Sequence, residues 1–426
     1  MENSSRLWGG TENMRVICLC NSNIPWGGGE VWHLNAALSL AARGWRVFLL
    51  CHPEGELIRR ARGYGSLLTV IPWAIGRLSF LNPVTHLRLR RFFRKQGVEA
   101  LIMNLPADLK VAGPAARAAG VRHIIYRRGS ALPVRDSRLN RYLYGKVITR
   151  LITNSQATRK LVLVNNPSLI PDERITVLPN GIDVGAFDKA LAAAGSASGM
   201  VERTGERRPF VLGNAGRLNR QKGQYLLLRL GRLLLDSGLD FRLLIAGEGE
   251  CEAELREQTA RLSLDNHVVF CGFVRDMAVF WRQIDLFVLS SLWEGFGNVL
   301  IEAMLAEKPV FAFGVSNIPE IVFEGSEGNG RLFPLPDDAL AQCPDFQSRA
   351  GGGEAVSPTP SSRTLPITPP DPSPEKEDGL AAMAKAVLEL AADPAEACRM
   401  GKAGRAFAMR FSQDVCMDAL EKLLAP

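Results

Sequence analysis

Two series of short apolar segments alternate with amphipathic stretches along this chain, and this alternation restricts its fold more than any other feature. In the first series, residues 14–20 form an apolar run with β-branched members, glycines follow at 27–29, and an amphipathic stretch leads to another apolar run at 45–51. A strand, glycine loop, helix and strand in this order make a βαβ unit, whose parallel strands need a right-handed crossover. Similar runs continue to residue 153. They predict a parallel sheet covered by helices.

A second series of the same kind occupies the latter half of the chain. Its strands are expected at residues 210–214, 241–246, 267–271, 285–289 and 309–313, with helices between them. With 426 residues, the chain exceeds what a single hydrophobic core usually supports, so two domains are expected. We therefore predict an α/β protein with two doubly wound, Rossmann-like domains in tandem.

Changes in composition set the expected boundaries. The prediction comprises a disordered N-terminus (1–13), a first domain (14–188), an Ala/Gly/Ser-rich linker (189–208), a second domain (209–410) and a final helix (about 411–426). A stretch rich in Pro, Ser and Gly at about 337–378 lacks the hydrophobic residues that would offset the entropy of ordering. We predict that this stretch is a disordered insertion.

Charge is distributed unevenly over the chain. Residues 84–160 contain 17 Lys or Arg and three acidic residues, a net charge of +14, whereas the whole chain carries +7. Such a basic segment favours an anionic partner, such as phospholipid, a phosphorylated acceptor or nucleic acid. Residues 86–96 alternate cationic and apolar groups, as on a helix that rests on anionic lipid or on a helix that is simply solvated. No aromatic stacking platform accompanies them, so nucleic acid is not expected.

The remaining composition concerns location and redox state. The first dozen residues are polar, and no window approaches the roughly 18 apolar residues of a spanning helix. These features predict a cytoplasmic protein, with peripheral attachment to the inner face of the membrane as an extension. The eight cysteines are scattered without a C-x-x-C pair, so buried, reduced thiols are expected rather than a zinc or dithiol site.

The glycines at 27–29 are the first candidate binding feature. Gly28 and Gly29 lie between a strand and a helix, where backbone N–H groups and the helix dipole suit an anion. A plain tight turn explains them equally well. Glu30 and His33, one turn apart, are expected to form a local surface pair, although Glu30 is also an acceptor-side candidate because it starts the helix.

Two cations follow the strand that opens the second domain. Arg217 and Lys222 lie in a loop that begins at Gly216, at the carboxyl end of a strand where ligands of α/β proteins bind. Two fixed cations at this place can neutralise a diphosphate and stabilise it as a leaving group. A solvated basic loop is the alternative.

The most specific stretch carries two glutamates, separated by seven residues. Glu294 lies in a polar loop after a strand, and Glu302 lies one to two turns inside the following helix. Carboxylates accept hydrogen bonds, so Glu294 suits sugar hydroxyls and Glu302 suits a ribose diol. The amides of residues 295–298, at the helix N-terminus, suit a phosphate. Two unconnected surface carboxylates are the alternative.

These motifs together resemble the group 1 (family 4) retaining glycosyltransferases. The resemblance rests on G-G-G-E at 27–30, P-N-G-I-D at 179–183, G-R-x4-K-G at 216–223, A-G-E-G at 246–249 and E-G-F-G-N-V-L-I-E-A-M at 294–304. It implies a GT-B fold, two Rossmann-like domains that face across a cleft. It also implies that the last helix crosses back onto the first domain.

The resemblance further implies the roles of individual residues. Arg217, Lys222 and Glu294 would be catalytic, the two cations holding the donor diphosphate and Glu294 contacting the transferred sugar. The other donor-binding residues would be Gly28, Gly29, Gly216, Glu248, Gly295, Phe296, Gly297, Asn298, Val299 and Glu302. Many family members have a His-Gly pair in the first domain where this chain has Arg128-Gly129. Arginine is not a base at neutral pH, so Arg128 is an acceptor-side candidate with an electrostatic role.

The expected activity is transfer of a sugar from a nucleotide-diphosphate donor to a glycan or lipid-linked acceptor, for example in lipopolysaccharide core synthesis. Asp-x-Asp is absent from the chain, so we expect a metal-independent, hexosyltransferase-like enzyme without cofactor in which cations take the place of a metal. A GT-B sugar-nucleotide 2-epimerase and a catalytically silent nucleotide-sugar-binding subunit remain as alternatives.

Overall fold

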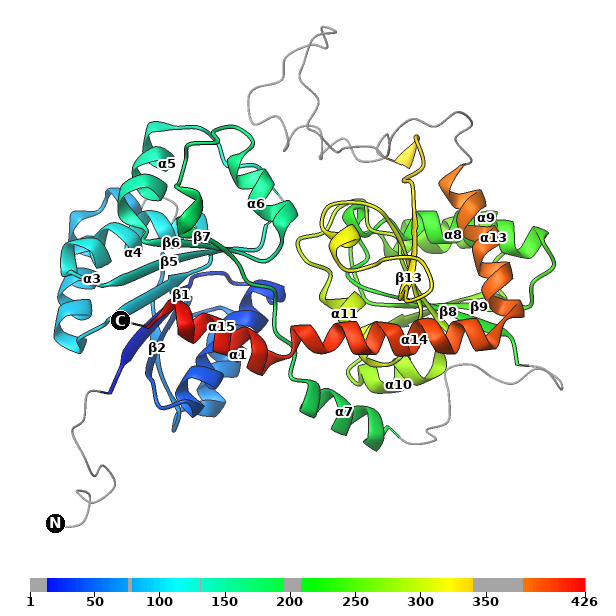
Figure 1. The fold of residues 1–426 in the computed structure, drawn as a ribbon, viewed down its shortest axis with the longest axis horizontal. Coiled ribbons are helices and arrows are strands. Elements are labelled where there is room, and N and C mark those ends of the chain that lie inside the picture. The colour runs from blue at the N-terminus through cyan, green and yellow to red at the C-terminus, as the bar shows by residue number, and fades with distance from the viewer. Residues whose placement is uncertain (1–13, 76–78, 131, 195–207, 340–377, 426) are drawn as a thin grey trace, which may run out of the picture. The chain divides into compact units, whose positions relative to one another are not determined.

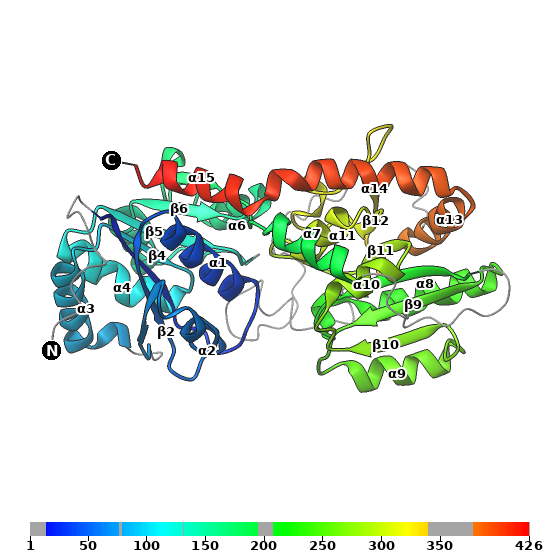
Figure 2. The same ribbon diagram turned by 90° about the horizontal axis from the view of Figure 1, so that it is seen from below.

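The computed structural model describes residues 14–75, 79–130, 132–194, 208–339 and 378–425. The chain divides into two compact units (Figures 1 and 2): unit 1 comprises Met1–Asn154, Thr158–Gly181 and Cys416–Pro426, and unit 2 comprises Ser155–Ala157 and Ile182–Val415. The predicted N-terminal segment, most of the predicted linker and nearly all of the predicted insertion lie outside the described residues.

Unit 1 is built on a parallel sheet of seven strands in the order β3-β2-β1-β4-β5-β6-β7. The strands are β1 (Val16–Asn21), β2 (Arg46–Cys51), β3 (Leu68–Pro72), β4 (Ala100–Met103), β5 (His123–Arg128), β6 (Arg150–Thr153) and β7 (Ile175–Val177). Successive strands are added towards one side of the sheet from β1 to β3 and towards the other side from β4 to β7, so the strand order reverses between β1 and β4. This is the doubly wound arrangement that the sequence predicts.

Helices cover both faces of this sheet because its strands are apolar on both sides. One face packs against α1 (Gly28–Ala42), α2 (Glu56–Ala61) and α15 (Gln413–Leu423), and the other packs against α3 (Pro83–Gln96) and α4 (Pro106–Ala119). Shorter helices of this part of the chain are α5 (Arg138–Tyr142) and α6 (Gln156–Leu163). Glu421 of α15 accepts hydrogen bonds from Trp45 Nε1 at 2.8 Å and from Arg43 at 2.9 Å.

Unit 2 repeats the design with six parallel strands in the order β10-β9-β8-β11-β12-β13. The strands are β8 (Phe210–Ala215), β9 (Phe241–Ala246), β10 (Val268–Gly272), β11 (Leu286–Leu289), β12 (Val310–Phe313) and β13 (Gly330–Phe333). The helices are α7 (Val184–Ala193), α8 (Gln224–Asp236), α9 (Glu252–Arg261), α10 (Met277–Gln283), α11 (Asn298–Leu305), α13 (Gly379–Ala392) and α14 (Pro394–Ala408). The two parallel sheets confirm the predicted pair of Rossmann-like domains.

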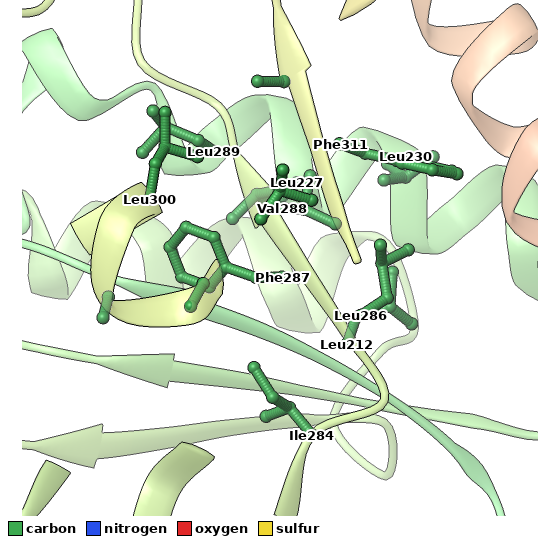
Figure 3. Close-up of a cluster of buried hydrophobic side chains, with 14 of the residues drawn as sticks. Leu212, Leu227, Leu230, Ile284, Leu286, Phe287, Val288, Leu289, Leu300 and Phe311 are labelled. Atoms are coloured by element: carbon green, nitrogen blue, oxygen red, sulfur yellow. The ribbon is translucent and has the colours of Figure 1, made fainter. Parts of the chain in front are cut away.

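The core of unit 2 holds the elements that present its polar loops. Figure 3 shows side chains of β11, among them Phe287 and Leu289, in one apolar cluster with Leu300 of α11 and Leu227 of α8. Because these side chains are almost fully buried, β11 and α11 have little freedom to shift. The loop between β11 and α11 is therefore anchored at both ends.

The division near residue 182 differs from the boundary drawn from composition. Residues 184–193 form α7 and belong to unit 2, although the sequence suggested a first domain to residue 188 and a linker from 189. Ile182 explains the difference, since its N–H donates to Phe411 O and its carbonyl accepts from Gln413 N at 2.8 Å.

Among the described helices, none is both long and apolar enough to cross a bilayer.

Candidate functional site

The predicted donor residues of unit 2 lie at the point where its strand order reverses. Ligands of open α/β sheets bind at the carboxyl ends of the strands at such a point. Here it falls between β8 and β11, which are paired neighbours. Gly216, Arg217 and Lys222 follow β8, and Glu294 follows β11.

The loop after β8 owes its shape to a cap and to one glycine. Asn219 begins a 3-10 turn, and its side-chain oxygen accepts a hydrogen bond from the Lys222 N–H at 3.1 Å. Gly223 ends the turn with φ +61°, and a Cβ there would lie 2.3 Å from Ser290 O. Only glycine therefore fits. Ser290 Oγ donates in turn to Lys222 O at 2.8 Å, which ties this loop to the loop after β11.

These ties bring Lys222 and Glu294 into an ion pair. Lys222 Nζ donates to Glu294 Oε1 at 2.5 Å, and Ser291 Oγ donates to the same oxygen at 2.6 Å. The Lys222 side chain is 20% exposed and that of Glu294 only 6%. Ser316 Oγ lies 3.1 Å from the Glu294 N–H, which donates to it. The pair is thus a partly buried, preorganised charge centre beyond the carboxyl ends of β8 and β11.

Gly216 provides the space in which the lysine stem lies. A Cβ on Gly216 would be 3.3 Å from Lys222 Cε, so the stem passes close over this glycine. Arg217, next to it, is exposed, and its guanidinium has no hydrogen bond or ion pair among the residues that the structure describes. Arg217 is therefore a free cation beside the paired one.

The A-G-E-G turn packs backbone to backbone against this loop. A Cβ on Gly247 would lie 2.0 Å from Gly216 O, and one on Gly249 would lie 2.2 Å from Leu218 O. The Leu218 N–H donates to Glu248 O at 2.9 Å. These approaches leave the Glu248 side chain exposed beside the loop.

The N-terminus of α11 opens onto the same loop. Gly297, at its cap, has φ +80°, and Asn298 and Val299 are the first helical residues. Gly295 and Phe296 precede them, and Phe296 O accepts a hydrogen bond from Asn317 Nδ2 at 2.7 Å. The helix dipole favours negative charge at this end, and the prediction of a phosphate contact at this N-terminus rests on that property.

Glu302 lies further along α11 and has an unusual setting. Its side chain is partly buried and has no hydrogen bond or ion pair with any other described residue. Burial disfavours the charged form and raises the pKa of the Glu302 carboxyl to about 7. An unpartnered carboxylate of this kind can accept hydrogen bonds from a diol.

In unit 1, the predicted surface pair of Glu30 and His33 is wrong, because both side chains are buried. Asn21 Nδ2 donates to Glu30 Oε1 at 3.1 Å, and His33 Nδ1 lies 3.2 Å from Gly29 O. Burial and the nearby Arg127 cation lower the pKa of His33 to about 3. The ring is therefore neutral at physiological pH.

Arg127 is the residue of this part that sequence reasoning missed. Arg127 is 2% exposed, and its guanidinium donates to Asn104 Oδ1 at 2.9 Å and to Asn180 Oδ1 at 2.5 Å. It also lies 4.4 Å from the centre of the Trp32 ring. Burial lowers the pKa of Arg127 to about 10. The negative charge of Glu30 acts in the opposite direction, because it favours the charged form of Arg127. Asn21, Asn104, Arg127 and Asn180 all lie at or just after the carboxyl ends of strands.

Arg128, the predicted acceptor-side residue, faces the opposite side of the sheet. Consecutive side chains of a strand alternate; Ile125 packs on the α1 side, whereas Tyr126 packs on the α4 side. Arg128 accordingly donates to Leu132 O at 2.5 Å. Gly28 and Gly29 begin α1, and a Cβ on Gly29 would lie 2.5 Å from Asn104 Nδ2, so this end of the helix lies tight against the loop after β4.

No group of three or more His, Cys, Asp or Glu in the described part of the chain is arranged to hold a metal ion. The charged groups available at the edge of unit 2 are Arg217, Lys222, Glu248, Glu294 and Glu302. They combine two cations with three carboxylates beside a helix N-terminus, a set that suits an anionic, hydroxyl-rich ligand.

Comparison with known proteins agrees with this class of fold. Residues 26–186 match the family described as Glycosyltransferase Family 4, and residues 209–343 match Glycosyl transferases group 1. An Anabaena protein, Alr3699/HepE, solved in complex with UDP, superposes with a TM-score of 0.72 at 19% identity, covering 96% of this chain and 99% of that one. The architecture is thus that of the two-domain GT-B proteins.

Two curated relatives extend the comparison to sequence. The lipopolysaccharide core biosynthesis mannosyltransferase LpsB of Rhizobium meliloti is 32% identical over 192 residues, 42% of this chain and 53% of that protein. The chain therefore spans about half the length of this relative. The phosphatidyl-myo-inositol mannosyltransferase of Mycobacterium leprae is 27% identical over 76% of this chain and 84% of its own length. The two family matches together span more than half of the 426 residues, and the chain belongs to the group 1 glycosyltransferases.

Proposed function

We propose that the protein is a retaining, metal-independent glycosyltransferase that moves a hexose from a nucleotide-diphosphate sugar to a glycan or lipid-linked acceptor. The observation that carries the proposal is the 2.5 Å pair of Lys222 Nζ and Glu294 Oε1 at the reversal point of unit 2. Relatives described as lipopolysaccharide and phosphatidylinositol mannosyltransferases support the acceptor class, and HepE, solved with UDP-glucose, supports the donor class.

In this proposal the donor is held through its charged and hydroxyl groups. Lys222, the free guanidinium of Arg217 and the N-terminus of α11 neutralise the diphosphate. Glu302 accepts hydrogen bonds from the ribose diol, and Glu294 accepts from the transferred sugar. Ser291 Oγ still donates to Glu294 and keeps it oriented. The Lys222 ammonium group donates one of its hydrogen bonds to the phosphate.

The chemical step needs no covalent bond to the enzyme. The bond between the anomeric carbon and the leaving phosphate oxygen breaks, and an acceptor hydroxyl forms the new bond on the same face. The hydroxyl proton passes to the departing phosphate, and the cations stabilise the charge that develops on the diphosphate. Arg217 and Lys222 supply the positive charge that a metal ion supplies elsewhere, so no cofactor is required.

We further propose that the protein works in the cytoplasm, with its basic first domain against an anionic acceptor or membrane surface. The net positive charge of residues 84–160 supports this placement. An epimerase is the second candidate, because the same nucleotide-sugar site could serve isomerisation. A silent binding subunit is the third.

Release of nucleoside diphosphate from UDP-, GDP- and ADP-sugars tests the proposal. A transferase releases diphosphate together with a glycosylated acceptor, an epimerase returns an altered sugar, and a silent subunit binds without turnover. Lys222→Ala should abolish release. Arg220→Ala is the matched control, because Arg220 lies on the same turn but pairs with Glu254 at 3.1 Å. If both variants turned over like the wild type, the site assignment would be wrong.

A further inference from the structure

The peptide group between Trp293 and Glu294 is held at both of its polar atoms. Gln221 Nε2 donates to Trp293 O at 3.0 Å, and the Glu294 N–H donates to Ser316 Oγ at 3.1 Å. The carbonyl and the N–H belong to one planar peptide unit, so the two hydrogen bonds fix the same plane. Because this plane leads directly into the Cα of Glu294, its orientation sets the direction in which the Glu294 side chain leaves the backbone.

The two side chains come from the loops on either side of β11. This strand lies between β8 and β12 in the sheet, and Gln221 follows β8 whereas Ser316 follows β12. Both loops hold the loop after β11 by a second bond. The Leu292 N–H donates to Gln221 O at 2.8 Å. Asn317, next to Ser316, donates from Nδ2 to Phe296 O at 2.7 Å. The peptide group is therefore held from both neighbouring strands.

Ser316 adopts a backbone conformation that serine seldom takes. Its φ is +53°, in the left-handed region that favours glycine. Strained residues of this kind persist only where the surrounding structure holds them, and they cluster at functional sites. Burial does not explain a serine here, because Ser316 is exposed. Glycine would fit the backbone without strain, but it has no hydroxyl to accept the Glu294 N–H.

We propose that Gln221 and Ser316 are positioning residues, a peptide clamp that directs the Glu294 carboxylate towards the transferred sugar. The inference rests on the proposed function, in which Glu294 accepts hydrogen bonds from that sugar. Small displacements of a positioned group lower the rate by large factors. The clamp should therefore act on sugar transfer and not on the binding of a nucleoside diphosphate, which lacks the sugar.

Substitutions of Ser316 separate positioning from stability. Ser316→Gly removes the hydroxyl but relieves the positive φ, so it should melt within about 2 °C of the wild type. Ser316→Ala removes the hydroxyl, keeps the strain and should melt lower. Despite this difference, both variants should lower turnover about tenfold, the effect of one lost hydrogen bond, on the sugar nucleotide that the wild type uses among UDP-, GDP- and ADP-sugars. Their affinity for the matching nucleoside diphosphate should stay unchanged.

Ser263→Gly is the matched control. Ser263 is also an exposed serine with positive φ, +55°, but it lies just after α9. Its replacement relieves the same backbone conformation without touching Glu294, so turnover should equal that of the wild type.

A pH profile tests Gln221. Gln221→Glu places a carboxylate against the Trp293 carbonyl at pH 8, whereas a protonated carboxyl at pH 5 can donate again. Its turnover, divided by that of the wild type at the same pH, should therefore rise on acidification. Gln221→Met has a similar shape and no donor at either pH, so its ratio to the wild type should be the same at both. If the two variants had the same profile, packing and not hydrogen bonding would explain their effect.

Amide hydrogen exchange tests the clamp without a donor. Exchange of the Glu294 N–H should be about tenfold faster in Ser316→Gly than in the wild type, because the amide loses its acceptor, and unchanged in Ser263→Gly. Unchanged exchange in Ser316→Gly, or full turnover by that variant, would overturn the positioning role. Faster exchange together with a wild type that turns over no sugar nucleotide would support the clamp and contradict the proposed function.

Discussion

Replacing Glu302 with glutamine should stabilise the free protein at pH 8 and weaken its binding of sugar nucleotides. An ordinary glutamate has a pKa of 4.5, whereas burial raises that of Glu302 to about 7. Since a shift of one pKa unit corresponds to about 1.4 kcal/mol, burial disfavours the charged form of Glu302 in the folded state by roughly 3 kcal/mol. Glutamine keeps the shape of the side chain and removes that charge.

The sign of the pH dependence follows from the raised pKa. The unfolded chain ionises first, so the folded state loses stability as the pH rises from about 4.5 to about 7, and the loss is complete above that range. Wild type and Glu302→Gln should therefore unfold alike at pH 4.5, while the variant is more stable at pH 8 by about 1 to 3 kcal/mol. Denaturant unfolding at both pH values measures the difference. A variant that is less stable at pH 8 would refute the reasoning.

Binding should depend on pH in the opposite direction. The ionised fraction of a carboxyl with a pKa of about 7 rises from about a tenth at pH 6 to about nine tenths at pH 8. If the carboxylate accepts the ribose hydroxyls, affinity should rise about tenfold over this range. Calorimetry with a sugar nucleotide is suitable, because its phosphates stay ionised throughout. An equal slope for wild type and Glu302→Gln would show that Glu302 does not touch the ligand.

Three further substitutions probe the contacts of both units. Lys222→Met should destabilise unit 2 by about 3 kcal/mol in denaturant unfolding, because it leaves buried Glu294 without its cation, and adding Glu294→Gln should restore stability but not turnover. Gly223→Ala should cost more than 2 kcal/mol because of the approach to a carbonyl, whereas Gly44→Ala, also at positive φ but in open space, should cost about 1 kcal/mol; similar values for both would contradict the close approach. Arg127→Gln should lower the melting temperature and diphosphate release while leaving sugar-nucleotide affinity unchanged, and Arg127→Lys should not rescue it because lysine cannot bond two separate acceptors in the same geometry; a lower donor affinity would contradict this.

The positions of the main strands along the chain could be predicted from the sequence, because each strand is an apolar run long enough to be distinguished from the glycine-rich loops and amphipathic helices around it. The short strands β7 and β13, with three and four residues, could not. Residues 175–177 are only partly buried, and residues 330–333 include Gly330 and Arg331. Their pairing depends on the neighbouring strand rather than on their own composition.

The members of the donor site could be proposed from the sequence, but not their pairing. Lys222 and Glu294 are 72 positions apart, and their contact depends on the tie of Ser290 to the lysine carbonyl and on the close approach at Gly223. Strand alternation shows that Arg127 and Arg128 face opposite sides. Which side carries α1 is settled only by packing, so the sequence could not favour Arg127.

Arg127 of unit 1 has a different setting from Arg217 of unit 2. Arg217 is exposed and can meet a ligand, whereas Arg127 is buried beneath the N-terminus of α1, whose dipole also carries positive charge. Glu30 is the acidic residue of the first turn of α1, and its charge stabilises the Arg127 cation. A glutamate that is 3% exposed and held by Asn21 is placed to compensate these charges rather than to meet an acceptor. The buried polar side chains at the carboxyl ends of the strands of unit 1 therefore stabilise the loops around them. The backbone of Gly28 and Gly29, which lies against Asn104, is the part of this region that remains available to a ligand.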